Sequence, residues 1–485
     1  MESPVQPTSG DAVPDATPLC VDLDGTLIRT DLLLESAVSL LKQNPLYLFA
    51  YPLWLLRGRA NLKHEIATRV HLDATTLPYD GRLLDALRTE HTHRPVILCT
   101  ASNQVFAKRV AQHLGTFSAV MATDGTRNLS GSTKAAALVD RFGESGFDYA
   151  GNEGRDIAIW RHARNAWVVN GSADLADRAD KVCRVAMVLP REGGGLRTWL
   201  HAFRLHQWLK NVLVFVPLLA AHLLMDPVAL VRATAAFLVF GVCASSVYIL
   251  NDILDLDADR LHPRKRKRPF ASGSLPLAAG FVVAPLMTLA AFVAANALEP
   301  RFALVLLGYY ALTLAYSFRF KQIAMLDVLV LAALYTLRII AGTTVIEVGF
   351  SFWLLAFSMF LFLSLALVKR YTELGVQRKA GSDTARGRGY ATSDYELLAS
   401  LGSASGYSSV LVLALYINST ASADLYHRPH VLWLLCPLLL YWISRVWIIA
   451  HRGAMHDDPV VFAARDKLSL VLLALAACVV VLAIR

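Results

Sequence analysis

The sequence predicts a multidomain protein, in which a soluble α/β part is followed by an all-α part that crosses a membrane with nine transmembrane helices. The 485 residues are 55% hydrophobic, and their mean hydropathy of +0.44 is too high for a soluble chain of this length. Short apolar runs that end in polar motifs come before residue 190, whereas long apolar segments come after residue 207. The short runs are typical of buried strands and the long ones of membrane-spanning helices.

Composition argues against several other classes of protein. The net charge of +9 does not indicate a nucleic-acid-binding protein, because the cations gather in short loops between apolar segments. The six cysteines are scattered without a C-x-x-C motif, so we expect neither disulfides nor a zinc site. Residues 1–18 are rich in Pro, Ser, Thr and Asp and lack an apolar stretch, which predicts a disordered tail and not a signal peptide.

Polar residues follow the apolar runs of the amino-terminal part. Asp22 and Asp24 lie two residues apart in a D-x-D-G-T-L motif, where Gly25 permits a sharp turn after a buried strand. Three further polar residues follow or open later elements of the same kind: Thr100, Lys134 and Asp156.

In their order and spacing these motifs resemble those of the haloacid dehalogenase (HAD) superfamily, over residues 19–188. The resemblance implies a doubly wound parallel sheet with a helical cap, inserted at about 31–95, and a phosphatase activity. The family usually carries an acid where this sequence has Asn152. The alternative is therefore a HAD-like domain kept for regulation or docking.

The resemblance also assigns roles to single residues. Asp22 would be the nucleophile that accepts a phosphoryl group, and Asp24 would be the general acid/base. Thr100 and Lys134 would neutralise the phosphate. Asp156, together with Asp22 and Asp24, would hold Mg²⁺.

Within the predicted cap, residues 45–56 (PLYLFAYPLWLL) are strongly apolar, and three cations follow at Arg57, Arg59 and Lys63. A helix of this length is too short to span about 30 Å of hydrocarbon. The segment either lies against lipid headgroups or packs inside the cap. In the first case, the phosphatase substrate would be a membrane lipid.

A linker rich in Pro and Gly, at 189–196, separates the two parts. The membrane part occupies 197–485 and begins with an amphipathic stretch that we expect to lie in the membrane interface. Each of its nine apolar segments is long enough to span with some tilt: 208–225, 229–250, 277–298, 302–318, 325–346, 350–368, 399–417, 430–450 and 467–484.

Lys and Arg are unevenly shared between the loops of the membrane part. Most lie in 260–268, 319–321, 369–388 and 452–467, whereas the alternate loops hold few. Because cytosolic loops of membrane proteins are enriched in Lys and Arg, these four loops and the amino-terminal part are predicted on the cytosolic side of the cell (inner) membrane.

The most polar stretch of the membrane part is 248–273, where an apolar helix runs into aspartates and then into five consecutive cations. If the helix continues past Asn251, then Asn251, Asp255 and Asp259 lie one turn apart. Asp252 flanks the same stripe. Oxygen ligands of this kind suit Mg²⁺, and the cations suit phosphate or pyrophosphate.

This stretch resembles the first aspartate-rich motif of the UbiA-type membrane prenyltransferase superfamily. The H-P-x-K-x-x-R-P run that contains Lys265 and Arg268 is similar to its decaprenyl-phosphate phosphoribosyltransferase branch. The resemblance covers about 197–485. It implies that Asp252, Asp255 and Asp259 form the catalytic Mg²⁺ site, with a polyprenyl phosphate and phosphoribosyl pyrophosphate as substrates.

Asp327 resembles the carboxylate of the family's second motif and is a further predicted metal ligand. The remaining residues predicted to bind substrate or phosphate are Asn251, Lys265, Arg268, Lys210, Asn211, Tyr316, Lys321, Arg338 and Lys369. Arg338 lies about 16 Å along the helix from Asp327, so we expect a substrate phosphate or another helix to satisfy it.

Two alternatives to phosphoribosyl transfer remain open from the sequence. The first is prenyl transfer from a prenyl diphosphate to an aromatic or lipid acceptor, for which the same aspartates would serve. The second is a transporter or other non-catalytic membrane protein with a regulatory HAD-like domain.

Overall fold

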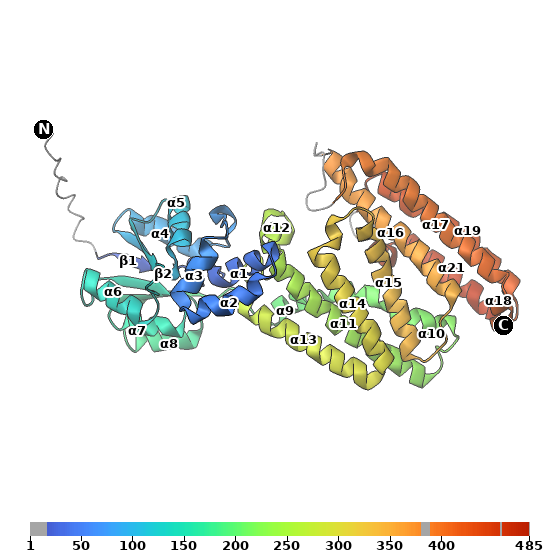
Figure 1. The fold of residues 1–485 in the computed structure, drawn as a ribbon, viewed down its shortest axis with the longest axis horizontal. Helices are drawn as coiled ribbons and strands as arrows, with labels where there is room; N and C mark the ends of the chain where they lie inside the picture. The colour runs from blue at the N-terminus through green and yellow to red at the C-terminus, as the bar shows by residue number, and fades with distance from the viewer. Residues whose placement is uncertain (1–16, 380–388, 456–457, 485) are drawn as a thin grey trace. The chain divides into compact units, whose positions relative to one another are not determined.

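The computed structural model describes residues 17–379, 389–455 and 458–484 of the chain. They form two compact units, whose elements are labelled in Figure 1. Unit 1 holds the described residues up to Phe203 together with Ile249–Val283, and unit 2 holds Arg204–Tyr248 together with the residues from Ala284 onward. The aspartate-rich stretch therefore packs with the amino-terminal residues. The predicted disordered tail lies almost entirely outside the described residues.

Six parallel strands form the centre of unit 1, in the order β3-β2-β1-β4-β5-β6. They are β1 (Leu19–Val21), β2 (Val96–Asn103), β3 (Ala119–Thr123), β4 (Asp148–Gly151), β5 (Asn165–Gly171) and β6 (Arg184–Pro190). Leu19 of β1 lies opposite Val96 of β2 on one side and Asp148 of β4 on the other. The chain thus extends the sheet from β1 first in one direction and then in the other, which confirms the predicted parallel sheet.

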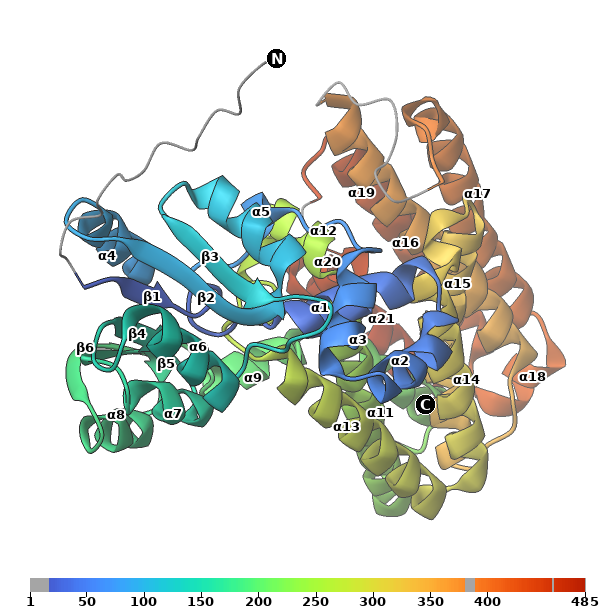
Figure 2. The ribbon, with the colours of Figure 1, turned by 60° about the vertical axis from the view of Figure 1, so that its left-hand side comes forward.

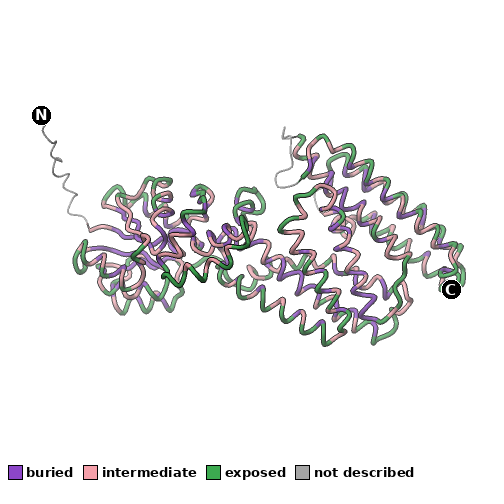
Figure 3. Tube along the Cα trace, viewed as in Figure 1, coloured by how far each residue is buried: buried purple, intermediate pink, exposed green. Residues whose placement is uncertain are grey.

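Helices cover both faces of the sheet (Figure 2). One apolar core includes side chains of α1 (Leu32–Gln43), α3 (Arg59–Ala67), α4 (Gly81–His91) and α5 (Gln104–Leu114). The other includes side chains of α6 (Ser132–Phe142), α7 (Ile157–Trp160) and α8 (Ala173–Asp180). Because both faces are covered, β1 is entirely buried and β2 almost entirely (Figure 3), so both appear in the sequence as continuous apolar runs.

Every element of secondary structure between β1 and β2 is a helix, as expected for the predicted cap. These elements are α1, α2 (Tyr47–Leu56), α3, the 3-10 turn η1 (Ala74–Thr76) and α4. Asp31 caps α1 by accepting the Leu34 N–H at 3.0 Å. The Leu32 N–H at the start of α1 also donates to Asp24 Oδ1 at 2.9 Å, so the start of α1 is fixed close to this aspartate.

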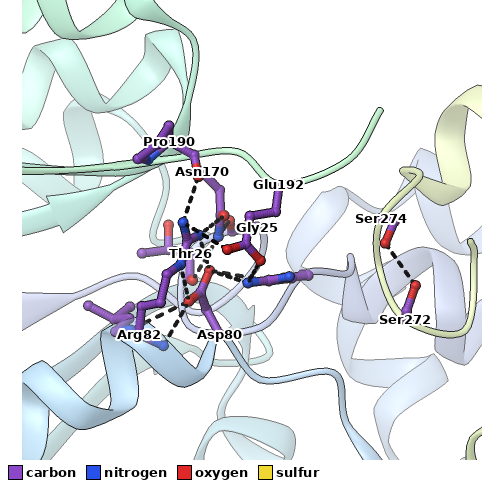
Figure 4. A network of polar contacts seen from close by, with 11 residues as sticks. Gly25, Thr26, Asp80, Arg82, Asn170, Pro190, Glu192, Ser272 and Ser274 are labelled. Carbon is purple, nitrogen blue, oxygen red and sulfur yellow. Dashed lines mark hydrogen bonds and ion pairs between the residues drawn. The ribbon is translucent and has the colours of Figure 1, made fainter. Parts of the chain in front are cut away.

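Polar contacts hold the turn that follows β1 (Figure 4). Arg82, at the start of α4, donates to Asp80 Oδ2 at 2.8 Å and to Asn170 Oδ1 at 3.2 Å. The Asn170 amide, near the end of β5, donates to the Gly25 carbonyl at 3.3 Å. The start of α4 and the end of β5, which are far apart in the sequence, therefore position this turn together.

Eight helices among the described residues are long and apolar enough to cross a membrane. They are Pro227–Leu254 (α11), Leu277–Leu298 (α13), Pro300–Phe318 (α14), Leu326–Val345 (α15), Phe352–Lys379 (α16), Thr392–Ile417 (η6 and α17), Pro429–His451 (η7 and α19) and Lys467–Ile484 (α21). The first of the nine predicted spans, 208–225, is not confirmed. It forms a 3-10 helix, η3 (Leu205–Phe215), and the short α10 (Val216–Ala220).

Shorter helices complete the described chain: α9 (Leu196–Ala202), α12 (Leu256–Leu261), η4 (Lys265–Lys267), η5 (Phe320–Gln322), α18 (Thr420–Leu425) and α20 (Pro459–Arg465). Within unit 2, α15, α16, α17 and α19 share one apolar core. A Cβ on Gly402 would lie 2.1 Å from the Trp447 ring, so glycine permits the close packing of α17 on α19.

Candidate functional site

The carboxyl end of β1 gathers the residues predicted for a phosphatase site. The Lys134 ammonium, from α6, donates to Asp22 Oδ1 and to the Tyr149 hydroxyl, each at 2.9 Å. The Tyr149 hydroxyl in turn donates to Asp156 Oδ1 at 3.2 Å. Asp22, Lys134 and Asp156 thus belong to one buried network. Tyr149 was not predicted from the motifs, although it stands in the same short strand that leads to Asp156.

Asp24 lies in a different environment from Asp22. The Ser102 hydroxyl donates to Asp24 Oδ2 at 2.5 Å and the Leu32 N–H donates to Oδ1 at 2.9 Å. Burial raises the pKa of Asp24 to about 7, and the nearby charge of Asp31 adds to the rise. A carboxyl group that exchanges a proton near neutral pH suits general acid/base catalysis. Thr100 is completely buried beside it and accepts the Ser102 N–H at 2.9 Å.

Asp156 is held by the backbone, because its Oδ2 accepts the N–H groups of Asn152 and Glu153 at 2.9 and 3.0 Å. Burial and the charge of Asp22 raise the pKa of Asp156 to about 6, although Lys134 opposes the rise. Two carboxylates that repel each other at a sheet edge fit a divalent cation. No group of three or more Asp, Glu, His or Cys side chains surrounds one point in the described part of the chain. The predicted ligands Asp22, Asp24 and Asp156 therefore do not form such a group among the described residues, and Asp22 and Asp156 would hold Mg²⁺ together with other oxygens.

Asn152 has a packing role next to the D-x-D turn. Its Oδ1 accepts the Thr26 hydroxyl at 3.1 Å. Gly25 adopts a positive φ of 74°, and a Cβ there would lie 2.2 Å from the Asn152 amide nitrogen. Asn152 and Gly25 are thus fitted to each other, and Asn152 supports the turn that carries both aspartates.

The aspartate-rich stretch does not continue as one helix. Helix α11 includes Asn251 and Asp252 but ends at Leu254, and Asp255 lies at a break before α12. The break is one residue long: the Asp255 N–H still donates to the Asn251 carbonyl at 2.9 Å and the Asp259 N–H to the Asp255 carbonyl at 2.8 Å, so these three residues remain one turn apart, as predicted. A tertiary contact then links two of the carboxylates, because Asp252 and Asp259 both lie beside Arg268.

Arg268 contacts two of the predicted metal ligands. Its Nη1 lies 2.5 Å from Asp259 Oδ2 and 3.3 Å from Asp252 Oδ1. Asn251, beside Asp252, has a buried Oδ1 without a hydrogen-bond partner. An unsatisfied amide oxygen next to carboxylates that already share one cation fits Mg²⁺, which prefers oxygen ligands. Lys265 lies in the exposed 3-10 turn between α12 and Arg268.

Two contacts tie this stretch to α1 within unit 1. Arg260, in α12, donates to Glu35 Oε1 at 2.5 Å and to Oε2 at 2.9 Å, with both side chains buried. The Arg260 Nε also donates to the Ala271 carbonyl at 3.1 Å, which fixes the loop that contains Arg268. Lys42 lies 3.3 Å from Asp255. No motif indicates the Glu35–Arg260 pair, whose members are 225 residues apart in the chain.

In unit 2, two of the predicted phosphate-binding cations share one carboxylate. Lys210 and Lys369 lie 2.8 and 3.2 Å from Asp458 Oδ2. Burial alone would raise the pKa of Asp458, but Lys369 and Lys210 hold it well below its usual range. The Tyr335 hydroxyl donates to Asp458 Oδ1 at 3.2 Å. The motifs predict no role for the loop that carries Asp458, and its residues 456–457 lie outside the described chain.

Arg338 is satisfied by protein groups of unit 2. Its Nε donates to Asn211 Oδ1 at 2.9 Å and its Nη2 donates to the Tyr309 hydroxyl at 3.2 Å. The guanidinium carbon also lies 5.1 Å from the centre of the Phe240 ring. We expected either a substrate phosphate or another helix to satisfy Arg338, and the structure shows side chains of two other helical segments. Asn211, which was predicted to bind substrate, is one of these partners.

The predicted metal ligand Asp327 is also engaged by protein groups. Its Oδ2 lies 2.8 Å from the Arg370 guanidinium, and its Oδ1 accepts the Tyr390 hydroxyl at 2.5 Å. Neither partner was predicted from the motifs. Tyr316 and Lys321 lie at the end of α14 and in η5, and both are half-buried. Residues 380–388 of the basic loop that follows Lys369 lie outside the described chain.

Unit 2 also contains an apolar cavity of about 980 Å³. It is lined by side chains of η3, α10, α16, α17, α19 and α21 that include Leu213, Pro217, Phe357, Leu439, Trp442 and Leu473. Few polar groups, among them Thr343 and Ser469, reach it. Its chemistry suits a long hydrocarbon chain.

Residues 212–471 match the model of the UbiA prenyltransferase family. The chain belongs to this family. Together with the eight apolar helices, this membership makes it a multi-pass membrane protein.

Similarity to individual proteins extends over different parts of the chain. An uncharacterized protein y4nM of Sinorhizobium fredii is 38% identical over 470 residues, or 96% of this chain and 91% of that protein. The decaprenyl-phosphate phosphoribosyltransferase of Mycobacterium tuberculosis is 37% identical over 198 residues, or 40% of this chain and 66% of that protein. The solved structure of a UbiA homolog from Archaeoglobus fulgidus, bound to GPP and Mg²⁺, has a TM-score of 0.47 and 18% identity over 58% of this chain and 99% of that one.

Proposed function

We propose that the membrane half transfers a phosphoribosyl group from phosphoribosyl pyrophosphate to a polyprenyl phosphate. The observation that carries the proposal is the position of Arg268, which contacts Asp252 and Asp259 at the end of a run of exposed cations. Carboxylates for a divalent cation and cations for phosphate thus lie in one short stretch, 252–268. The similarity to decaprenyl-phosphate phosphoribosyltransferase supports this substrate pair.

In the proposed reaction, an oxygen of the lipid phosphate attacks the anomeric carbon of the ribose, and the bond from that carbon to pyrophosphate breaks. Mg²⁺ held by Asp252, Asp255 and Asp259 would neutralise charge on the departing pyrophosphate. Lys210 and Lys369 bind the lipid phosphate, and Asp458 compensates part of their positive charge. No general base is needed, because a phosphate monoester is already an anion.

We further propose that the amino-terminal half is a HAD-like phosphatase that removes the 5-phosphate from the lipid-linked product. Asp22 attacks phosphorus while Asp24 protonates the oxygen of the sugar as the ester bond breaks. Asp24 then takes a proton from the water that hydrolyses the phosphorylated Asp22. Lys134 neutralises the phosphate. The buried network around Asp22 and the near-neutral pKa of Asp24 support this assignment.

The transfer step is tested with purified protein in lipid vesicles supplied with Mg²⁺ and a polyprenyl phosphate. Asp252→Ala is expected to abolish product formation from phosphoribosyl pyrophosphate, while Asp257→Ala, which removes a neighbouring carboxylate outside the proposed site, retains it. A parallel reaction with a prenyl diphosphate and an aromatic acceptor tests prenyl transfer. If product forms only in that reaction, the donor is a prenyl diphosphate and not phosphoribosyl pyrophosphate.

The phosphatase step is tested by mass spectrometry of the lipids made by wild-type protein and by Asp22→Asn. We expect the phosphorylated lipid to accumulate in Asp22→Asn, while wild type yields the lipid that lacks one phosphate. Identical lipid profiles would exclude the phosphatase on this product and favour a regulatory role for the amino-terminal half.

The proposed location is the cell (inner) membrane, with the amino-terminal half in the cytoplasm. The enrichment of Lys and Arg in alternate loops supports this orientation.

A further inference from the structure

Helix α2 presents an apolar stripe that the described residues leave exposed. None of its ten residues is buried. Leu46, Phe49, Leu53 and Leu56 are 67%, 73%, 63% and 85% exposed, respectively. They are three and four residues apart, so they lie on one side of the helix. A contiguous stripe of large apolar side chains on a soluble surface indicates an interaction site.

The other side of α2 is fixed to the rest of unit 1. Tyr47, Tyr51 and Trp54, which are also four and three residues apart, face the apolar core. The Tyr51 hydroxyl donates to the Ala37 carbonyl at 2.6 Å. The Arg69 guanidinium lies 4.9 Å from the centre of the Trp54 ring. Helix α2 is therefore held in place with the apolar stripe outward, and ordinary cap packing does not account for the stripe.

The chemistry of this surface favours lipid as its occupant. The exposed cations Arg57 and Arg59 directly follow the stripe, and such a pairing of apolar and basic residues matches an anionic membrane surface. Unit 1 also includes the end of α11 and the start of α13, two of the eight helices long and apolar enough to cross a bilayer. We propose that α2 inserts its stripe into the headgroup region of the bilayer, and that the phosphatase site therefore acts on a phosphomonoester carried by a membrane lipid.

Helix α3 connects the stripe to the phosphatase site. It begins at Arg59, and its Lys63 donates to the Ala101 carbonyl at 2.7 Å and to Asn128 Oδ1 at 2.9 Å. Ala101 lies between Thr100 and Ser102, at the end of β2. The Lys63 ammonium is thus at the edge of the site, where it adds positive charge. The second part of the proposal rests on the proposed phosphatase function, whereas the first part does not.

Membrane insertion is tested with the full-length protein in vesicles of phosphatidylcholine and phosphatidylglycerol. Cys478→Ser removes the one exposed cysteine of the described chain, since the others are buried. In this background, Phe49→Cys and the exposed control Arg88→Cys on α4 are labelled with an environment-sensitive fluorophore. We expect acyl-chain-brominated lipids to quench most of the emission at position 49 and none at position 88.

Two results would overturn insertion. If the label at position 49 emits as it does in water, nothing covers the apolar stripe of α2. If its emission is typical of an apolar environment but brominated lipid does not quench it, protein covers the stripe, such as a second copy of the chain. Either result rejects the bilayer as the occupant of α2.

The lipid-borne substrate is tested with a matched pair of compounds, a synthetic polyprenyl phosphoribose 5-phosphate in vesicles and soluble ribose 5-phosphate. The double variant Phe49→Ser/Leu53→Ser is expected to lower hydrolysis of the lipid-borne compound by about tenfold and to leave hydrolysis of the soluble one unchanged. Equal loss on both compounds would overturn the lipid-substrate part. If wild type hydrolyses neither, the proposed phosphatase fails, and quenching still decides the membrane contact by itself.

Discussion

The buried pair of Glu35 and Arg260 makes a sharp prediction about stability. Their side chains are only 6% and 4% exposed. Arg260→Met leaves the Glu35 carboxylate with the Thr30 hydroxyl, which donates at 3.0 Å, and removes the donor to the Ala271 carbonyl. Loss of one partner of a buried ion pair costs about 3–5 kcal/mol. For a unit of roughly 200 residues, each kcal/mol lowers the midpoint of thermal unfolding by about 2–4 °C, so we expect a fall of about 10 °C.

Two further variants separate the pair from its surroundings. Glu35→Leu alone should destabilise unit 1 to a similar degree, because it leaves the Arg260 charge buried. The double variant Glu35→Leu/Arg260→Met should recover most of the loss, since apolar side chains of similar volume can replace a buried ion pair. Arg88→Met, which breaks an exposed pair with Asp85, is the control and should change the midpoint by no more than about 1–2 °C.

The assay is thermal unfolding of the purified full-length protein in detergent, followed by tryptophan fluorescence at one heating rate for all variants. The same preparations are tested for phosphoribosyl transfer, because Arg260 fixes the loop that contains Arg268. The reasoning is refuted if Arg260→Met unfolds within about 2 °C of wild type, or if the double variant is no more stable than the single ones.

Three other predictions concern the amino-terminal site and the topology. Hydrolysis at saturating soluble substrate should decline above about pH 7, as Asp24 loses its proton, and Ser102→Ala should move the decline to higher pH because it removes a hydrogen bond that lowers this pKa. A pH–rate profile that is unchanged in Ser102→Ala would contradict this role. Gly25→Ala should abolish hydrolysis and spare transfer, since the new Cβ would meet Asn152 at 2.2 Å and strain a backbone at φ of 74°. Retained hydrolysis would show that the turn tolerates a side chain. Cysteines introduced at Arg88 and at Lys267 should react with an impermeant reagent from the same side of sealed vesicles, and labelling from opposite sides would reject the proposed orientation.

The sequence by itself determined the features that depend on local chemistry. Buried parallel strands require continuous apolar runs, which predicted the sheet. The resemblance of the polar motifs to the HAD superfamily grouped Asp22, Lys134 and Asp156, and these three residues lie in one network. Long apolar segments likewise predicted the spanning helices, because length and hydropathy decide whether a helix can cross a bilayer.

Only the tertiary structure decided which charged groups meet. Periodicity predicted that Asn251, Asp255 and Asp259 lie one turn apart, but it did not predict that Arg268 pairs with Asp252 and Asp259. Asp458 compensates two distant lysines in the same way. A charge removed from water must find a partner wherever packing brings one close, and that choice depends on the whole fold and not on spacing along the chain.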